Sequence, residues 1–171
     1  MNQVESMLRE FHEEAGTTKR VLGRVPADKL GWKPHERSMS LGQLALHIAT
    51  VPGGIARITK PDAFDVSLSN FNPPMPKSME EIHSALEETV RTVERTLKET
   101  TQDAAEANWH LMSGEKELAK MPRVTAWRSL MLNHWYHHRG QLAVYLRLLD
   151  VPVPSIYGPS ADESPVFVKA D

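Results

Sequence analysis

The residues with the clearest chemical potential are histidines grouped near position 134. The chain has eight histidines, and the segment HWYHH contains three of them. His134 and His138 are four residues apart, so on a helix their imidazoles lie on one face about a turn apart. His47 lies on an earlier apolar stripe and is expected to face the same interior. Three neutral imidazoles that converge there would suit zinc, nickel, iron or copper.

A bound ion would also resolve a physical problem on this apolar face. Buried imidazole nitrogens without partners cost about 1–3 kcal/mol each, and an ion satisfies one nitrogen per ring. A structural site is normally closed by a fourth protein ligand, whereas three ligands leave positions open. An open site can hold water or bind a substrate thiolate or oxyanion.

Other interpretations of the histidines stay open at this point. A core histidine often only hydrogen-bonds a neighbour, and His134 with His137 is a rival pair because i,i+3 positions also share a face. The apolar stripe favours His138, since His137 is displaced by about 100° around the helix. Arg139 and Gln141 could orient ligands or line the site, or they could serve in a salt bridge and a cap. The remaining histidines are expected on the surface or in loops: His12, His35, His83 and His110.

Other candidate motifs are weak. The chain contains no P-loop, no G-x-G-x-x-G and no H-E-x-x-H. The acidic pairs at 80–81 and 87–88 are predicted to be solvated charges on a helix surface. Trp109, Trp127 and Trp135 are predicted to be core or interface anchors, and exposed tryptophans on a helix would favour a dimer.

Composition excludes several classes of protein. The 171 residues suit one domain, and the absence of cysteine excludes disulfides, zinc ribbons and thiol nucleophiles. The net charge of −2 without a basic stripe argues against nucleic acid as a partner. The charged N-terminal segment lacks the apolar run of a signal peptide, and no stretch reaches the roughly 18 apolar residues of a membrane span. We therefore expect a cytoplasmic protein without a membrane partner.

The elements that position the histidines are predicted to be helices. Four segments have helical periodicity, from Val4 to Leu22, from after Ser40 to about Ile58, from Ser78 to about Thr100, and from about Pro122 to Leu149. Ser78 and Glu81 have the spacing of a capping box. Pro52 predicts a kink or a break in the second helix, just after His47. With no strong strand signal, this pattern predicts an all-α four-helix bundle.

The connections are less regular. The segment NWHLMSGEKELAKM could form a short hairpin around Ser113-Gly114, and residues 61–76 are predicted to be irregular, long enough for a crossover. The tail, about 151–171, has four prolines and is expected to be extended but packed. We expect residues 1–171 to form a single domain.

The segments SMSLGQLALHIATVPGG and LNHWYHHRGQLAVYLRLLDVPVPSIYGPSADE together resemble the DinB/YfiT family. That family has a histidine on the second helix and H-x-x-x-H-R-G-Q on the last, here His47, and His134 and His138 followed by Arg139, Gly140 and Gln141. The first and third helices match only in pattern and length. The resemblance implies a DinB-like four-helix bundle with a long link between helices 2 and 3. It also implies a homodimer and a divalent ion on the three histidines, nickel or zinc first, with iron or manganese as further candidates.

The same resemblance suggests an activity, because relatives include bacillithiol S-transferases and mycothiol-dependent maleylpyruvate isomerase. A metal-dependent thiol S-transferase, or a related hydrolase or isomerase, would take its nucleophile from a low-molecular-weight thiol, which suits a chain without cysteine. The general base is not identified, and His137 is the nearest candidate in sequence. The alternative is a non-catalytic metal-binding stress-response protein. A third reading is a helical interaction module without a metal.

Overall fold

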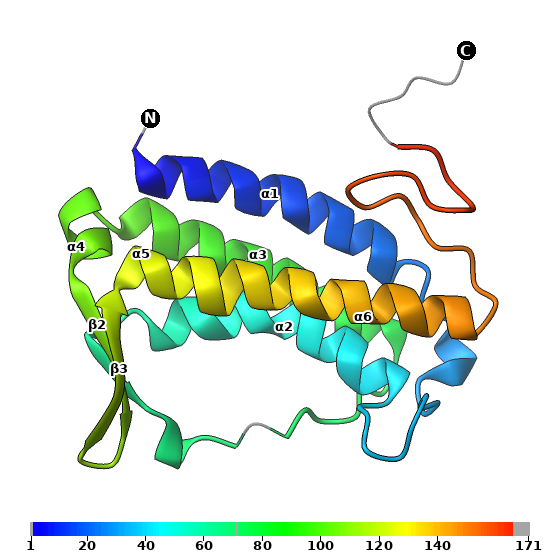
Figure 1. Cartoon of the computed structure of the whole chain (residues 1–171), viewed down its shortest axis with the longest axis horizontal. Coiled ribbons are helices and arrows are strands. Elements are labelled where there is room, and N and C mark those ends of the chain that lie inside the picture. Colours follow the sequence, from blue (N-terminus) through cyan, green and yellow to red (C-terminus); the bar gives the residue numbers. More distant parts are fainter. Residues whose placement is uncertain (1, 71, 166–171) are drawn as a thin grey trace.

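Four long helical stretches lie side by side in the computed structural model, which describes residues 2–70 and 72–165 (Figure 1). Three of them are α1 (Gln3–Leu22), α2 (Leu41–Ile58) and α3 (Met79–Glu99). The fourth is continuous through α5 (Arg123–Ala126), the π-helical segment η3 (Trp127–Asn133) and α6 (His134–Leu148). Both α1 and α2 contact α3 and α6. The expected helical segments are therefore present, although the last begins at Arg123 because Pro122 ends a strand.

Side-chain caps fix where the long helices begin. Asn2 and Glu5 form a reciprocal capping box at α1, and Ser40 and Gln43 form one at α2. At α3, Ser78 accepts from the backbone N–H of Glu81. The expected reciprocal bond is absent there, because the Glu81 carboxylate accepts from the backbone N–H of Lys77 instead, at 2.7 Å.

Three tryptophans connect the last helix and the sheet to α2 through hydrogen bonds. Trp109, Trp127 and Trp135 are all fully buried. Their indole N–H groups donate to the carbonyl of Ile58, the hydroxyl of Thr59 and the carbonyl of Ile48, at 3.2, 2.7 and 2.8 Å. They are core anchors, so the idea that exposed tryptophans would support a dimer is wrong for these three residues.

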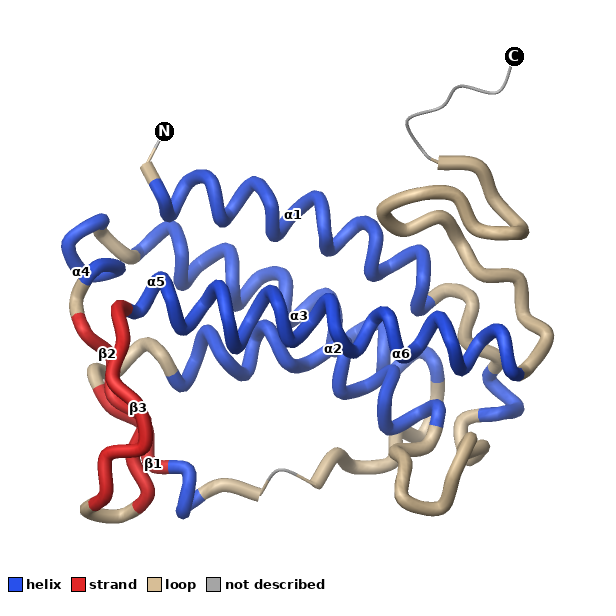
Figure 2. The backbone as a smooth tube through the Cα atoms, viewed as in Figure 1, coloured by secondary structure: helices blue, strands red, loops and turns tan. Residues whose placement is uncertain are grey.

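A small sheet closes one end of the helices (Figure 2). It contains β1 (Ala63–Asp65), β2 (Asn108–Ser113) and β3 (Lys116–Pro122) in the order β1-β2-β3. The hairpin β2–β3 is antiparallel and turns where Gly114 adopts a positive φ of 58°, as the Ser113-Gly114 signal indicated. The all-α expectation is wrong in this respect. Strand β1 pairs in parallel with the distant β2 and is too short to leave a periodic pattern in the sequence.

The link after α2 crosses back along the length of the helices (Figures 1 and 2). It passes through β1 and the 3₁₀ turn η2 (Val66–Leu68) before α3 begins at the opposite end. As a result, α2 and α3 run in the same direction. They approach closely at Gly53, where a Cβ atom would lie only 2.8 Å from the Thr89 hydroxyl oxygen. Two short elements, η1 (Ala27–Lys29) and α4 (Gln102–Glu106), complete the path.

Pro52 does not break α2, which continues through it to Ile58. The predicted break is therefore wrong, and the facing helix also departs from regular α geometry, where η3 widens into a π-helix just before His134. A π-helical turn takes up an additional residue and shifts the direction of the side chains that follow it. The π-helical segment thus lies directly before the first histidine of the last helix.

The tail has no helix or strand between residues 151 and 165, and residues 166–171 of the expected tail lie outside the described part. It folds back onto α1 and α6. Arg20 and Arg147 pair with Glu163 and Asp162, at 2.9 and 2.5 Å. In the parts of the chain that are described, no helix combines the length and apolar character needed to cross a membrane.

Candidate metal centre

The three histidines singled out by spacing come together between α2 and α6. His47 projects from α2, and His134 and His138 from the first turns of α6. Their candidate ligand nitrogens all lie within 4.8 Å of one another. The ring centroids of His47 and His138 are 4.5 Å apart, and those of His47 and His134 are 5.5 Å apart. All three side chains are partly buried.

The local sequence explains this convergence. On α2, His47 is followed by the fully buried Ile48, so the ring lies at the border of the apolar face. On α6, positions 134 and 138 share a face one turn apart, and the π-helical segment sets the angle at which that face begins. The pair four residues apart and His47 on the facing helix are therefore the histidines that the fold brings together.

The closest contact in the triad joins the Nε2 atoms of His134 and His138, which are 2.6 Å apart. Two nitrogens facing each other at this distance either share a proton or are both turned toward one cation. A tetrahedral ion with nitrogen ligands at 2.0–2.1 Å holds them about 3.4 Å apart. Against this spacing, the 2.6 Å pair would open by about 0.8 Å, and a separation of 4.8 Å, the upper limit within the triad, would close by about 1.4 Å. The donor set and its spacing fit a divalent ion.

Gln141 determines which nitrogen of His138 is available. Its Oε1 atom lies 2.7 Å from Nδ1 of His138. An amide oxygen accepts only, so Nδ1 carries the hydrogen and Nε2 keeps its lone pair toward the centre of the triad. Ligand histidines are commonly oriented through their second nitrogen in this way. Of the two roles open for Gln141, the orienting one matches the structure.

Arg139 forms a salt bridge, the other role that the sequence left open for it. Its side chain is only 1% exposed and forms an ion pair with Glu14 of α1. It also donates to the hydroxyls of Thr18 and Tyr157, the former at 3.1 Å. Arg139 thus joins α6, α1 and the tail on the far side of the helix from the triad.

The electrostatics of the site keep the rings neutral. Burial, followed by the like charges that His138 and His134 would carry, lowers the pKa of His47 to about 4. Burial also lowers the pKa values of His134 and His138, although a backbone hydrogen bond at Leu130 and the bond with Gln141 oppose it. Because these pKa values are lowered, the three rings are neutral at neutral pH without any ion present. Neutral imidazole is the form that binds a metal.

The remaining histidines stand apart from this cluster. His137 is exposed, and its ring centroid lies 5.0 Å from that of His138. The rival pairing of His134 with His137 is therefore not the one that the fold assembles. His12 and His35 are exposed, while His83 and His110 are half-buried and belong to other surfaces.

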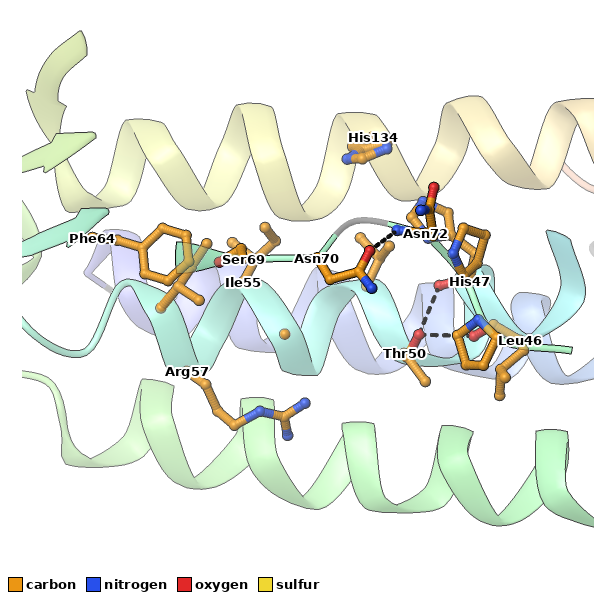
Figure 3. A pocket seen from close by; sticks show the side chains of 15 residues that line it. Leu46, His47, Thr50, Ile55, Arg57, Phe64, Ser69, Asn70, Asn72 and His134 are labelled. Carbon is orange, nitrogen blue, oxygen red and sulfur yellow. Dashed lines mark hydrogen bonds between the residues drawn. The ribbon is translucent and has the colours of Figure 1, made fainter. Parts of the chain in front are cut away.

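A cavity of about 420 Å³ opens beside His47 and His134. In Figure 3 it runs along α2 from Leu46 and His47 to Ile55 and Phe64. Its walls are mostly apolar, with polar groups from Thr50, Asn70 and Asn72. The residues from the link were not identified from the sequence, because a segment with no periodicity carries no signal of the helix it will cover.

Comparisons with known proteins agree with this architecture. A model of the DinB family matches residues 1–165. The uncharacterized protein YrdA of Bacillus subtilis strain 168 is 25% identical over 160 residues, which cover 94% of this chain and 91% of that protein. A DinB-like crystal structure from Bacillus cereus ATCC 10987 superimposes with a TM-score of 0.73 at 24% identity, covering 92% of this chain and 100% of that one. The DinB-like protein YjoA of Bacillus subtilis gives a TM-score of 0.65 at 18% identity, with 95% and 99% covered.

Proposed function

The chain belongs to the DinB family, and from this premise we propose that it binds one divalent metal ion through His47, His134 and His138. Nickel and zinc are the first candidates, followed by iron and manganese. The observation that carries the proposal is the convergence of three imidazoles from two facing helices, with their candidate nitrogens within 4.8 Å.

Two further features support a metal ion over simple packing. The lowered pKa values of the three rings mean that little proton competition opposes binding at neutral pH. Gln141 also fixes the tautomer of His138 that directs Nε2 to the centre. The Nε2 lone pair of His138 is then available to an ion at the centre of the triad.

We further propose that the site serves a thiol S-transferase, in which a low-molecular-weight thiol attacks an electrophilic substrate. When bound, the ion would act as a Lewis acid that favours the thiolate form of the incoming thiol. The sulfur–carbon bond forms as the leaving group departs with its electron pair, and the thiol proton passes to solvent. The chain has no cysteine, so the nucleophile must come from the cosubstrate.

The cavity beside the triad supports a small-molecule substrate. Its apolar wall, including Val51, Ile55 and Phe64, can remove water from the apolar part of an electrophile. His47 and His134 line the same cavity, so a molecule held there lies next to the proposed ligands. Three protein ligands leave room for an exogenous sulfur or oxygen atom.

Incubating the protein with an alkylating electrophile such as monobromobimane and a panel of biological thiols tests this activity. Nickel- or zinc-loaded protein should accelerate thioether formation over metal-free protein, and the His138→Ala variant should remove the acceleration. Full metal occupancy without a rate above the metal-free control across the panel would reject the transferase proposal. It would leave the non-catalytic metal-binding alternative.

The assembly and location of the chain are separate predictions. The homodimer expected from the family resemblance is checked by sedimentation velocity, with a monomer at micromolar concentration as the contradicting result. The cytoplasmic location is checked by fractionation of the source cells.

A further inference from the structure

Pro52 leaves one carbonyl of α2 without its usual helical partner. In an α-helix, the carbonyl of Ile48 would accept from the backbone N–H of residue 52. Proline has no N–H, so this acceptor must find another donor or remain unpaired. Ile48 is fully buried, which excludes a simple exchange with solvent.

Trp135 supplies the missing donor. Its indole N–H donates to the Ile48 carbonyl at 2.8 Å, and its side chain is fully buried. The ring is held in place by Phe11 of α1, which stacks on it with centroids 5.3 Å apart and planes 21° from parallel. The indole therefore has little freedom to leave this acceptor.

The position of this bond relates it to the triad. Ile48 directly follows His47 on α2, and Trp135 directly follows His134 on α6. The hydrogen bond thus joins the two helices at the residues next to two of the three proposed ligands. It fixes both the separation of α2 and α6 and their offset along the helix axes at this point.

We propose that Trp135 is a positioning residue of the histidine triad, and that Pro52 creates the acceptor through which it acts. This inference rests on the proposed metal binding, and the structure offers a close control for it. Trp127 lies on the same helical stretch, is also fully buried and donates to the Thr59 hydroxyl at 2.7 Å. It anchors the same two helices at their other end, away from the histidines.

The first experiment compares Trp135→Phe with Trp127→Phe. Both substitutions remove one indole donor, and both should lower the unfolding midpoint. Affinity for Ni²⁺ and for Zn²⁺, measured by competition with a chromophoric chelator, should fall only in Trp135→Phe. We expect the metal affinity of Trp135→Phe to fall about ten-fold or more. Ten-fold is the lower end of the loss that follows when a residue that orients a metal ligand is replaced. Equal affinities in the two variants would overturn the inference.

A second experiment separates positioning from mere satisfaction of the carbonyl. In the Trp135→Phe background, Pro52→Ala gives Ile48 a donor within its own helix. The unfolding midpoint should recover, whereas the metal affinity should stay low because the tie between helices is still missing. Recovery of both would show that Trp135 only satisfies a polar group, and would contradict the proposal.

The single variant Pro52→Ala keeps the test decisive if Trp135→Phe does not fold. Alanine favours the helix, and a hydrogen bond from its N–H would draw the Ile48 carbonyl toward the helix axis and out of line with the indole. Metal affinity should then fall while the unfolding midpoint holds or rises, and an unchanged affinity would overturn the inference. A wild-type chain that takes up neither ion would instead reject the proposed metal binding itself, so the two failures are distinguishable.

Discussion

The Oε1 atom of Gln141 lies 2.7 Å from Nδ1 of His138, three residues earlier on α6. The amide oxygen accepts the Nδ1 hydrogen and leaves Nε2 free to face the triad. This relationship explains why a glutamine in the last-helix motif matters to a site whose proposed ligands are all histidines.

Replacing Gln141 by leucine should weaken metal binding, by about ten-fold, because His138 loses the acceptor that selects its tautomer. Gln141→Glu should retain or raise the affinity, since a carboxylate also accepts from Nδ1. Chelator competition measures both variants. Gln3→Leu, at an exposed position on α1, is the control that should leave affinity unchanged, and a Gln141→Leu variant with wild-type affinity would refute the tautomer argument.

The stability of the metal-free protein should fall as the pH drops from about 6.5 toward 4. Burial and neighbouring imidazoles lower the pKa of His47 to about 4 in the folded chain, from an ordinary value of about 6.5. Between these values the unfolded chain binds more protons than the folded one, so stability rises with pH across that window. Urea unfolding at a series of pH values measures the slope.

His47→Gln is the control for that slope. It removes the titrating ring, so the dependence of stability on pH between about 4 and 6.5 should become shallower. The other lowered pKa values, those of His134 and His138, keep part of the slope. An identical slope in the wild type and the variant would mean that His47 does not titrate abnormally.

Arg139 should be among the most sensitive positions for stability. Its side chain is 1% exposed and that of its partner Glu14 is 15% exposed, so Arg139→Met leaves a partly buried carboxylate without its cation. Breaking such a pair costs about 3–5 kcal/mol of unfolding free energy, measured by urea denaturation. Arg91→Met, which breaks an exposed pair with Glu88, should leave the unfolding midpoint nearly unchanged. Equal midpoints for the two variants would contradict the account.

The cavity should determine turnover without determining metal binding. Ile55→Trp places a larger side chain in the cavity of about 420 Å³, and should lower the rate of thioether formation while metal stoichiometry stays that of the wild type. Val144→Trp, on an exposed part of α6, is the matched control. Undiminished turnover in Ile55→Trp would place the substrate elsewhere.

The sequence was informative wherever local periodicity decided the structure. The i,i+4 spacing of His134 and His138 and the apolar stripe around His47 predicted the triad, since helical geometry alone fixes which side chains share a face. The predicted start after Ser40 and the serine cap predicted at Ser78 likewise agree with α2 and α3, which begin at Leu41 and Met79.

The sequence was uninformative where distant segments decide the outcome. Strand β1 exists because it pairs with β2. Its three residues lie in an irregular link and have no pattern that predicts this pairing. From the sequence, Pro52 predicts a kink or a break in its own helix. Its main consequence lies on another helix, because the carbonyl it frees is satisfied by Trp135. The π-helical segment before His134 also left no pattern that single-helix periodicity could detect.

The central claim is that His47, His134 and His138 bind a metal ion. Elemental analysis of the chain, purified without a metal-affinity tag, tests this most directly beside a His134→Ala, His138→Ala double variant. His137→Ala serves as the control on the neighbouring exposed histidine. We predict about one equivalent of nickel or zinc in the wild type and in His137→Ala, and none in the double variant. No metal in any of them, with no uptake on reconstitution, would contradict the account and leave a helical protein whose histidines only pack.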